Sequence, residues 1–157
     1  VSVARENQRI TLTTNSDLHR GDQIRVPVEG ALVLRMNDGS QFQLQSDSDA
    51  QVVPVSSILG SRPDGETPCL LLTRGRADAT LVVPAGAPGV LVATPHATLE
   101  ARELSRGTLM VTAGSTKLDV RRGRISFSRR TDGKTLVLKQ GTYAVATDGG
   151  PFQAKDL

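Results

Sequence analysis

Aromatic residues and cysteine are scarce in this 157-residue chain. It contains three Phe, one Tyr and no Trp, so a hydrophobic core has to be built mainly from aliphatic side chains. The lone cysteine, Cys69, excludes an intramolecular disulfide and a multi-cysteine metal site. Because free cysteine behaves as a small apolar residue, we expect Cys69 to be buried on a strand rather than to act as a reactive thiol.

Long hydrophobic runs are also missing. No stretch approaches the ~20 apolar residues that a membrane-spanning helix requires. The chain has no signal peptide and begins at Val1 rather than Met, so we expect a processed chain, a fragment or a portion of a longer protein. Any membrane span would then lie outside these residues. The length and composition predict one globular domain over residues 1–157.

Helical periodicity is weak throughout the sequence. The best helix candidate, residues 99–107, has only two leucines five positions apart. Short runs of alternating apolar and polar residues recur instead, as in RITLTT (9–14) and DQIRVPV (22–28), and turn residues separate them. We therefore predict an all-β fold of roughly a dozen short antiparallel strands, about five residues each. A sandwich, a barrel and a solenoid remain open, and a parallel βαβ architecture is disfavoured.

Three connecting segments carry specific predictions. ALVLRM and QFQLQ (31–45) flank Asp38-Gly39, which supplies the positive φ of a tight hairpin turn. Residues 56–68 contain two prolines and two glycines, which predicts a long surface loop or a joint between subdomains. Residues 147–157 read as a fraying end or a linker.

Positive charge is concentrated in one segment. Residues 117–134 contain seven cationic side chains and two carboxylates, a balance of +5, whereas the whole chain carries +3. The alternation places Ile125 and Phe127 on an apolar face and predicts that every charged residue of the segment lies on an outer face or in a turn. An antiparallel sheet with one solvated face produces this pattern without any partner.

Two kinds of partner would also suit this segment, namely an acidic protein or a polyanionic glycan. Nucleic acid is disfavoured, because the one aromatic residue of the segment, Phe127, falls on the apolar face and no recognition helix is evident. The candidate partner-binding residues are Arg121, Arg122, Arg124, Arg129 and Arg130.

Signatures of catalysis are missing from the sequence. It contains no G-x-S-x-G nucleophile motif and no glycine-rich phosphate-binding loop. His19 and His96 are far apart and have no cysteine cluster near them, so their spacing indicates no metal site. We expect His96 to be structural or exposed. The sequence therefore predicts no enzyme activity, no catalytic or metal-binding residues and no cofactor.

The order of the segments resembles the FecR-type domain of transmembrane sigma-factor regulators. The resemblance covers about residues 20–147. It is carried by GDQIRVPVEGALVLRMNDGSQFQLQ (21–45), by TPHA (94–97) and by the L-x-V-x-x-G-x-I pattern at 118–125. Two features depart from the family. The Gly-Thr at positions 107 and 108 precedes Leu-Met-Val instead of an aromatic strand, and residues 56–68 look like an insertion.

The resemblance implies stacked short strands in a solenoid-like or twisted two-sheet arrangement, without catalytic residues. It also implies an extracytoplasmic location, in the periplasm or at the surface of a bacterium. The partner would be another envelope protein, in the family typically the signalling domain of an outer-membrane receptor, with relay to a sigma factor. The alternative is a structural subunit of a surface layer or filament that binds copies of itself, because stacked β modules present edges to further strands.

Overall fold

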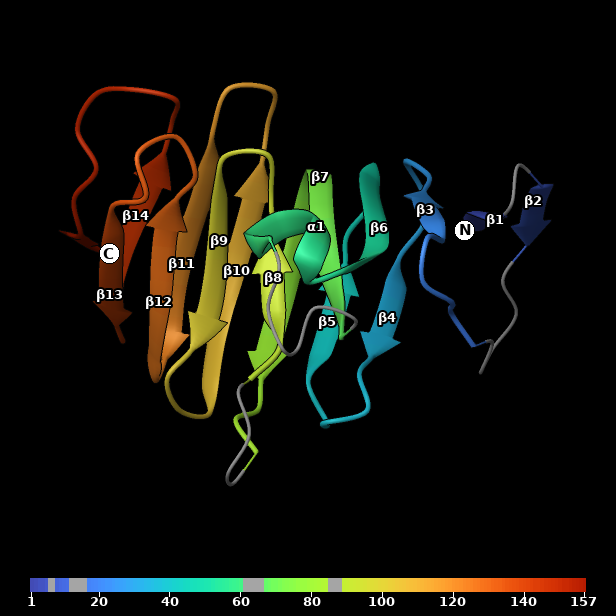
Figure 1. The fold of residues 1–157 in the computed structure, drawn as a ribbon, viewed down its shortest axis with the longest axis horizontal. Helices are drawn as coiled ribbons and strands as arrows, with labels where there is room; N and C mark the ends of the chain where they lie inside the picture. The colour runs from blue at the N-terminus through green and yellow to red at the C-terminus, as the bar shows by residue number, and fades with distance from the viewer. Residues whose placement is uncertain (6–7, 12–16, 61–66, 85–88) are drawn as a thin grey trace.

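A computed structural model describes residues 1–5, 8–11, 17–60, 67–84 and 89–157 (Figure 1). Nearly all regular structure in them is β, as predicted. The first strands are β1 (Ser2–Arg5), β2 (Gln8–Thr11), β3 (Gln23–Val26), β4 (Leu32–Arg35), β5 (Gln41–Leu44), β6 (Ser48–Pro54) and β7 (Pro68–Leu81), with helix α1 (Ser56–Leu59) between β6 and β7. The remaining strands are β8 (Leu91–Ala93), β9 (Ala97–Ala101), β10 (Ser105–Val111), β11 (Thr116–Arg122), β12 (Arg124–Arg129), β13 (Thr135–Lys139), β14 (Thr142–Ala146) and β15 (Lys155–Asp156).

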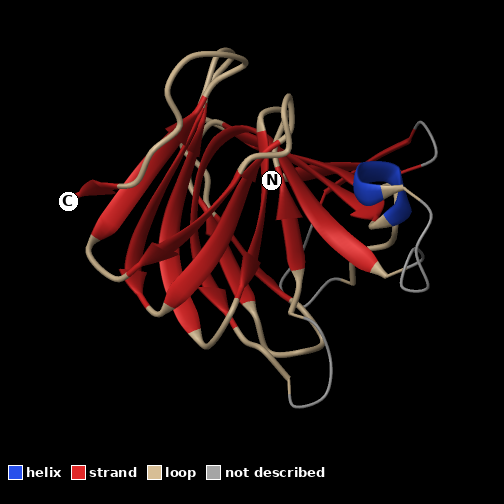
Figure 2. Cartoon of the chain, turned by 60° about the vertical axis from the view of Figure 1, so that its left-hand side comes forward, coloured by secondary structure: helices blue, strands red, loops and turns tan. Residues whose placement is uncertain are grey.

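The strands form two layers that share β7. The first layer has the order β2-β1-β3-β6-β7-β8-β9-β12-β13, and the second has the order β4-β5-β7-β10-β11-β14-β15. Strands succeed one another along the long axis from the N-terminal to the C-terminal end (Figure 1), and the sheet is strongly curled (Figure 2). This arrangement confirms the predicted all-β fold. Every strand pairing in the described residues is antiparallel except that of β7 with β8.

Strand β7 crosses from the first layer to the second at Gly75. Its first half pairs with β6 and β8, and its second half pairs with β5 and β10. Gly75 has φ 109°, and a Cβ atom there would lie 2.6 Å from Cα of Ser48. Only glycine fits this crossing, because other residues rarely adopt that φ and have no room for a side chain. The segment RGRAD (74–78) therefore does not interrupt β7, which is one 14-residue strand.

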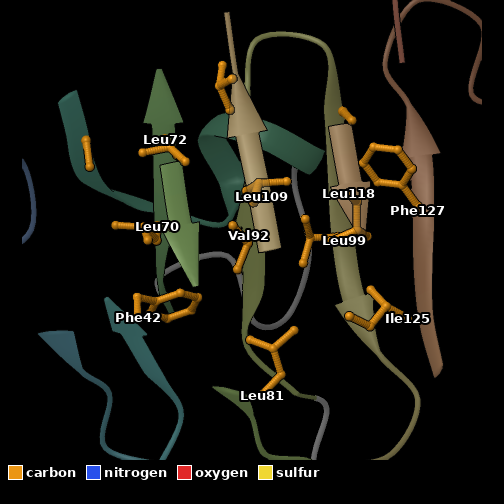
Figure 3. Packing of buried hydrophobic residues seen from close by; sticks show 14 of the residues in the cluster. Phe42, Leu70, Leu72, Leu81, Val92, Leu99, Leu109, Leu118, Ile125 and Phe127 are labelled. Atoms are coloured by element: carbon orange, nitrogen blue, oxygen red, sulfur yellow. The ribbon is translucent and has the colours of Figure 1, made fainter. Parts of the chain in front are cut away.

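The core lies between the two layers and is largely aliphatic (Figure 3). The first layer contributes Leu70, Leu72, Val92, Leu99, Ile125 and Phe127, and the second contributes Phe42, Leu81, Leu109 and Leu118. These side chains occupy alternate positions of their strands, so each strand buries one face. Cys69 is fully buried on β7, which confirms its expected place.

The C-terminal tail is part of the folded structure, so the prediction of a fraying end is wrong. Phe152 is buried, with 1% of its surface exposed, and lies against Phe127. Strand β15 pairs with β14, and the N–H of Leu157 donates to the carbonyl oxygen of Gly141 at 2.9 Å. Two glycines, a proline and five polar residues make up most of the tail, and no local pattern indicates that one aromatic side chain anchors it.

Other local predictions have mixed outcomes. The hairpin of β4 and β5 is confirmed, with Gly39 at φ 94° in its turn. The helix candidate at residues 99–107 is wrong, since β9 and β10 occupy most of that range. Within the predicted loop at residues 56–68, the described part contains α1, while residues 61–66 lie outside the description. The predicted strand at residues 9–14 is β2 as far as Thr11, and its last residues also lie outside. In the described ranges, no helix is long and apolar enough to cross a membrane.

Candidate functional site

The five arginines predicted to bind a partner lie at opposite ends of β12. Arg121, Arg122 and Arg124 surround the crossover from β11 in the second layer to β12 in the first. Arg129 ends β12, and Arg130 follows it. At ~3.3 Å per residue, the strand separates Arg124 from Arg129 by about 16 Å. The five side chains therefore do not form one surface patch.

The crossover is a tight corner at Gly123. Its φ is 79°, and a Cβ atom there would lie 2.5 Å from the carbonyl oxygen of Leu104. The buried hydroxyl of Ser105 accepts a hydrogen bond from the N–H of Arg124 at 3.1 Å. The N–H of Arg102 donates to the carbonyl oxygen of Arg124 at 2.9 Å. The turn between β9 and β10 is thereby held against the crossover.

Strand pairing brings further cations to this corner. Arg106 lies opposite Arg122 in the β10–β11 ladder, and Arg121 is the extra residue of a bulge there. Lys139 lies opposite Arg124 in the β12–β13 ladder. We call this surface the basic corner; it consists of Arg102, Arg106, Arg121, Arg122, Arg124 and Lys139.

The basic corner carries most of the unbalanced charge of the chain. All six of its side chains belong to exposed residues. Glu103 is the one ion-pair partner they have in the described part of the chain, through Oε1 at 2.9 Å from Nε of Arg124. Six cations and one carboxylate leave a charge of +5, whereas the whole chain carries +3. The remaining residues therefore sum to −2.

A shallow open depression lies within the basic corner. It is lined by Glu103, Leu104, Arg122, Gly123, Lys139 and Gln140. Leu104 is 52% exposed, so the depression combines an apolar side chain with charged ones. Surfaces of this mixed kind suit protein partners, whose contacts combine apolar and charged groups.

Sequence spacing identified three residues of the basic corner and missed the other three. Arg102, Arg106 and Lys139 lie outside the basic segment. Strand register places Arg106 and Lys139 beside it, and the hydrogen bond from the N–H of Arg102 to the carbonyl oxygen of Arg124 places Arg102 there. The position of Arg106 could have been predicted from the short turn that follows Val111. Because this turn joins two antiparallel strands, counting back from it along both strands places Arg106 opposite the last residues of β11.

The prediction that Arg129 lies in an exposed turn is wrong. Its side chain is 8% exposed, and its Nη2 lies 2.6 Å from Oδ2 of Asp132. Its Nη1 donates to the carbonyl oxygen of Gly150 at 2.9 Å, and its guanidinium carbon lies 5.2 Å from the ring centroid of Phe152. Arg129 keeps the inward phase of Ile125 and Phe127, four and two residues earlier, because β12 continues to its position. It serves the fold and is not accessible to a partner.

The ion pair of Arg129 changes the acidity of its partner. The hydrogen bond from the guanidinium is the main cause that lowers the pKa of Asp132 to about 2, and the N–H of Lys134 adds to the effect. Both hydrogen bonds favour the charged carboxylate. Asp132 therefore holds the turn after β12 in its ionised form.

Arg130 is exposed as predicted, but it is tied to a neighbouring turn. Its N–H donates to the carbonyl oxygen of His96 at 2.9 Å, and its Nη1 donates to the carbonyl oxygen of Thr94 at 3.0 Å. These bonds hold the end of β12 against the turn between β8 and β9. The contacts indicate a structural role for this side chain.

His96 belongs to a buried polar cluster that joins the two layers. Its Nε2 donates to the carbonyl oxygen of Ala113 at 3.2 Å, and its Nδ1 shares a hydrogen bond of 2.9 Å with Oγ1 of Thr116. Oγ1 of Thr94 lies 2.7 Å from that of Thr116 and accepts hydrogen bonds from the N–H groups of His96 and Ala97. Of the two predicted alternatives for His96, structural or exposed, the structure shows the first, because the side chain is buried and hydrogen-bonded. The described residues contain no cluster of potential metal ligands.

Cys69 has the properties of an inert thiol. Burial raises its pKa to about 11, because the thiolate is poorly solvated inside the core. Its nucleophilic form is therefore scarce at neutral pH.

Comparison with known proteins identifies a shared fold. No family model and no curated protein matches the chain. Two crystal structures of a putative anti-sigma factor from Parabacteroides distasonis are similar to it, with TM-scores of 0.66 and 0.65 and 14% sequence identity. The match covers 85% of this chain and 59% of theirs. The chain thus has the fold of part of those proteins, and the FecR-type assignment stays a prediction.

Proposed function

We propose that this chain is a non-catalytic protein-binding module of a bacterial sigma-factor regulator and that it works outside the cytoplasm. The observation that carries the proposal is the two-layer fold that it shares, over 85% of its length, with putative anti-sigma factors. The FecR-type resemblance of residues 20–147 points to the same kind of protein and supplies the extracytoplasmic location. In this proposal the module binds a partner, and contact with the sigma factor is made elsewhere in the parent protein.

A binding role without catalysis also agrees with the chemistry of the described residues. The buried polar side chains of Thr94, His96 and Thr116 hydrogen-bond to one another, and Cys69 is inert. The exposed charge at the basic corner is suited to attracting and orienting a partner.

A structural subunit of a surface layer or filament has less support. Phe152 and the tail cover the C-terminal end of the stack. Lys134 precedes the edge strand β13 and Lys139 ends it, and charged residues on an edge discourage strand addition. A mass by light scattering that rises with concentration would favour assembly over the proposed function.

The proposed function is tested by deleting the codons for residues 1–157 in frame from the native gene. We expect a coherent change in the transcripts of one sigma-factor regulon, because the regulator loses its input. An unchanged transcriptome, with the shortened protein present at the parental level, would contradict the proposal. The location is tested separately with alkaline phosphatase fused after Leu157, which is active only if the module is exported.

A further inference from the structure

We propose that the basic corner binds an acidic, extended segment of the partner protein, with carboxylates at Arg122 and Lys139 and an apolar side chain against Leu104. This inference rests on the proposed function, since it names the chemistry of the partner that the module binds.

Like charges are paired directly across two neighbouring ladders of the basic corner. Arg106 lies opposite Arg122, and Arg124 lies opposite Lys139. Cross-strand partners have Cβ atoms only about 5 Å apart, and like charges at that distance are destabilising. Only Arg124 has a carboxylate partner in the described residues. An anionic ligand would remove this repulsion, so binding it is favoured beyond the direct contacts.

Two arginines on β3 and β7 are neutralised by aspartates of the chain. Arg25 lies 2.6 Å from Asp47 and 3.2 Å from Asp49. Arg74 lies 2.6 Å from Asp47 and 3.5 Å from Asp49. The chain thus supplies aspartate partners for these two arginines, whereas five of the six cations of the basic corner have no carboxylate partner in the described residues. That contrast marks the corner as a surface with charge available to a partner.

The contacts of the depression favour a peptide over a polyanionic glycan. Arg124 already binds the carboxylate of Glu103 through Nε at 2.9 Å, which shows that an extended carboxylate side chain reaches these guanidinium groups. A uniformly charged glycan would bring negative charge against Glu103, and it would offer no apolar group to the exposed side chain of Leu104. A segment that mixes acidic and apolar side chains can place a carboxylate on Arg122 and an apolar group on Leu104. Arginine is well suited to this contact because it binds carboxylates through two parallel hydrogen bonds.

The test uses the full 157-residue chain and a fluorescent synthetic peptide of sequence Glu-Glu-Leu-Glu-Glu-Leu with blocked ends. We expect Arg122→Glu and Lys139→Glu each to weaken binding by about tenfold or more, because each places a like charge against the peptide. Lys134→Glu is the matched control, since it makes the same charge change at the opposite end of β13. It should weaken binding less than about twofold, because exposed charges separated by more than a Debye length of ~8 Å are largely screened. Replacing every Glu of the peptide by Gln should abolish binding.

Three results would overturn the inference. The first is that Arg122→Glu binds the peptide with the same affinity as the parent chain, while the two proteins unfold at the same thermal midpoint. The second is equal binding of the Gln peptide, which would show that charge is irrelevant. The third is a heparin fragment of equal charge that binds more tightly than the peptide and loses affinity in the same variants, which would assign the corner to a glycan.

Failure of this inference can be separated from failure of the proposed function. If deletion of the module changes the regulon and Arg122→Glu in the native gene leaves regulation intact, the function stands and the partner binds elsewhere. If the corner binds the peptide but deletion of the module changes no regulon, the regulatory function is wrong and the binding chemistry stands.

Discussion

The rings of Phe127 and Phe152 lie against each other at the C-terminal end of the stack, with centroids 5.6 Å apart and planes inclined by 51°. Phe127 belongs to β12, whereas Phe152 comes from the tail that follows β14. Tilted aromatic pairs at this distance are favourable beyond the area that they bury. The contact closes one end of a structure in which each strand otherwise packs mainly against its neighbours. Stacked folds need such a cap, because their last unit would expose the core.

Phe152→Ala tests the cap. We expect a loss of about 3–5 kcal/mol in the free energy of unfolding, as for other buried Phe→Ala changes. Urea denaturation followed by circular dichroism measures it. Gln153→Ala, next to it in the tail and exposed, is the control and should change stability by less than about 0.5 kcal/mol. Equal stabilities of the two variants would show that the tail does not cap the fold.

Asp132→Asn tests the ion pair with Arg129 through its pH dependence. The pKa of Asp132 in the folded protein is about 2, below its ordinary value of 3.8. The ionised carboxylate therefore stabilises the fold fully above pH about 4, and this contribution is lost as the pH falls toward about 2. We expect the thermal midpoint of the parent to exceed that of the variant at pH 6 and the two to converge near pH 2.

The parent and variant both retain other acid-sensitive groups. Hydrogen bonds from Arg5 and Arg25 are the main causes that lower the pKa values of Asp22 and Asp47, so both proteins should lose stability in acid. Only the difference between the two curves reports Asp132. A difference that stays constant from pH 6 to pH 2 would contradict the assignment.

Gly75→Ala tests the crossing of β7 between the layers. The added methyl group would lie 2.6 Å from Cα of Ser48, at a φ of 109°. We expect destabilisation of more than about 1 kcal/mol, because the residue is incompatible with both the space and the backbone conformation. Gly114→Ala is the matched control, since its φ is not positive and no atom lies within 4 Å of the new methyl group. Chemical denaturation of the two variants distinguishes a required glycine from a tolerated one.

Thr116→Val tests the buried polar cluster around His96. The change keeps the shape of the side chain and removes the hydroxyl that contacts Nδ1 of His96 and Oγ1 of Thr94. We expect a cost of about 1–3 kcal/mol, because buried polar groups lose a partner. Thr112→Val, at an exposed turn, serves as the control and should change stability by less than about 0.5 kcal/mol. If both variants unfold at the same urea concentration, the cluster contributes nothing measurable.

Local patterns were sufficient for the class of fold and for several elements. Alternation in β3 and β5 predicted half-buried strands, and the described side chains alternate accordingly. Asp38-Gly39 predicted the hairpin of β4 and β5. These predictions succeed because a two-residue period and a positive φ depend on neighbouring residues only.

The tertiary structure decided what depends on contacts between distant residues. Strand register brought Arg106 and Lys139 to the basic corner, and no local pattern contains that information. Arg129 stayed on the inner face because Asp132, Gly150 and Phe152 compensate its charge there.

The polar tail looked like a linker, yet the burial of one phenylalanine against the end of the stack anchors it. Alternation along the chain thus determined that strands form and which face of most of them is apolar. Which strands pair, where the chain crosses between layers and which cations meet depend on long-range packing, because those contacts join residues that are far apart in the sequence.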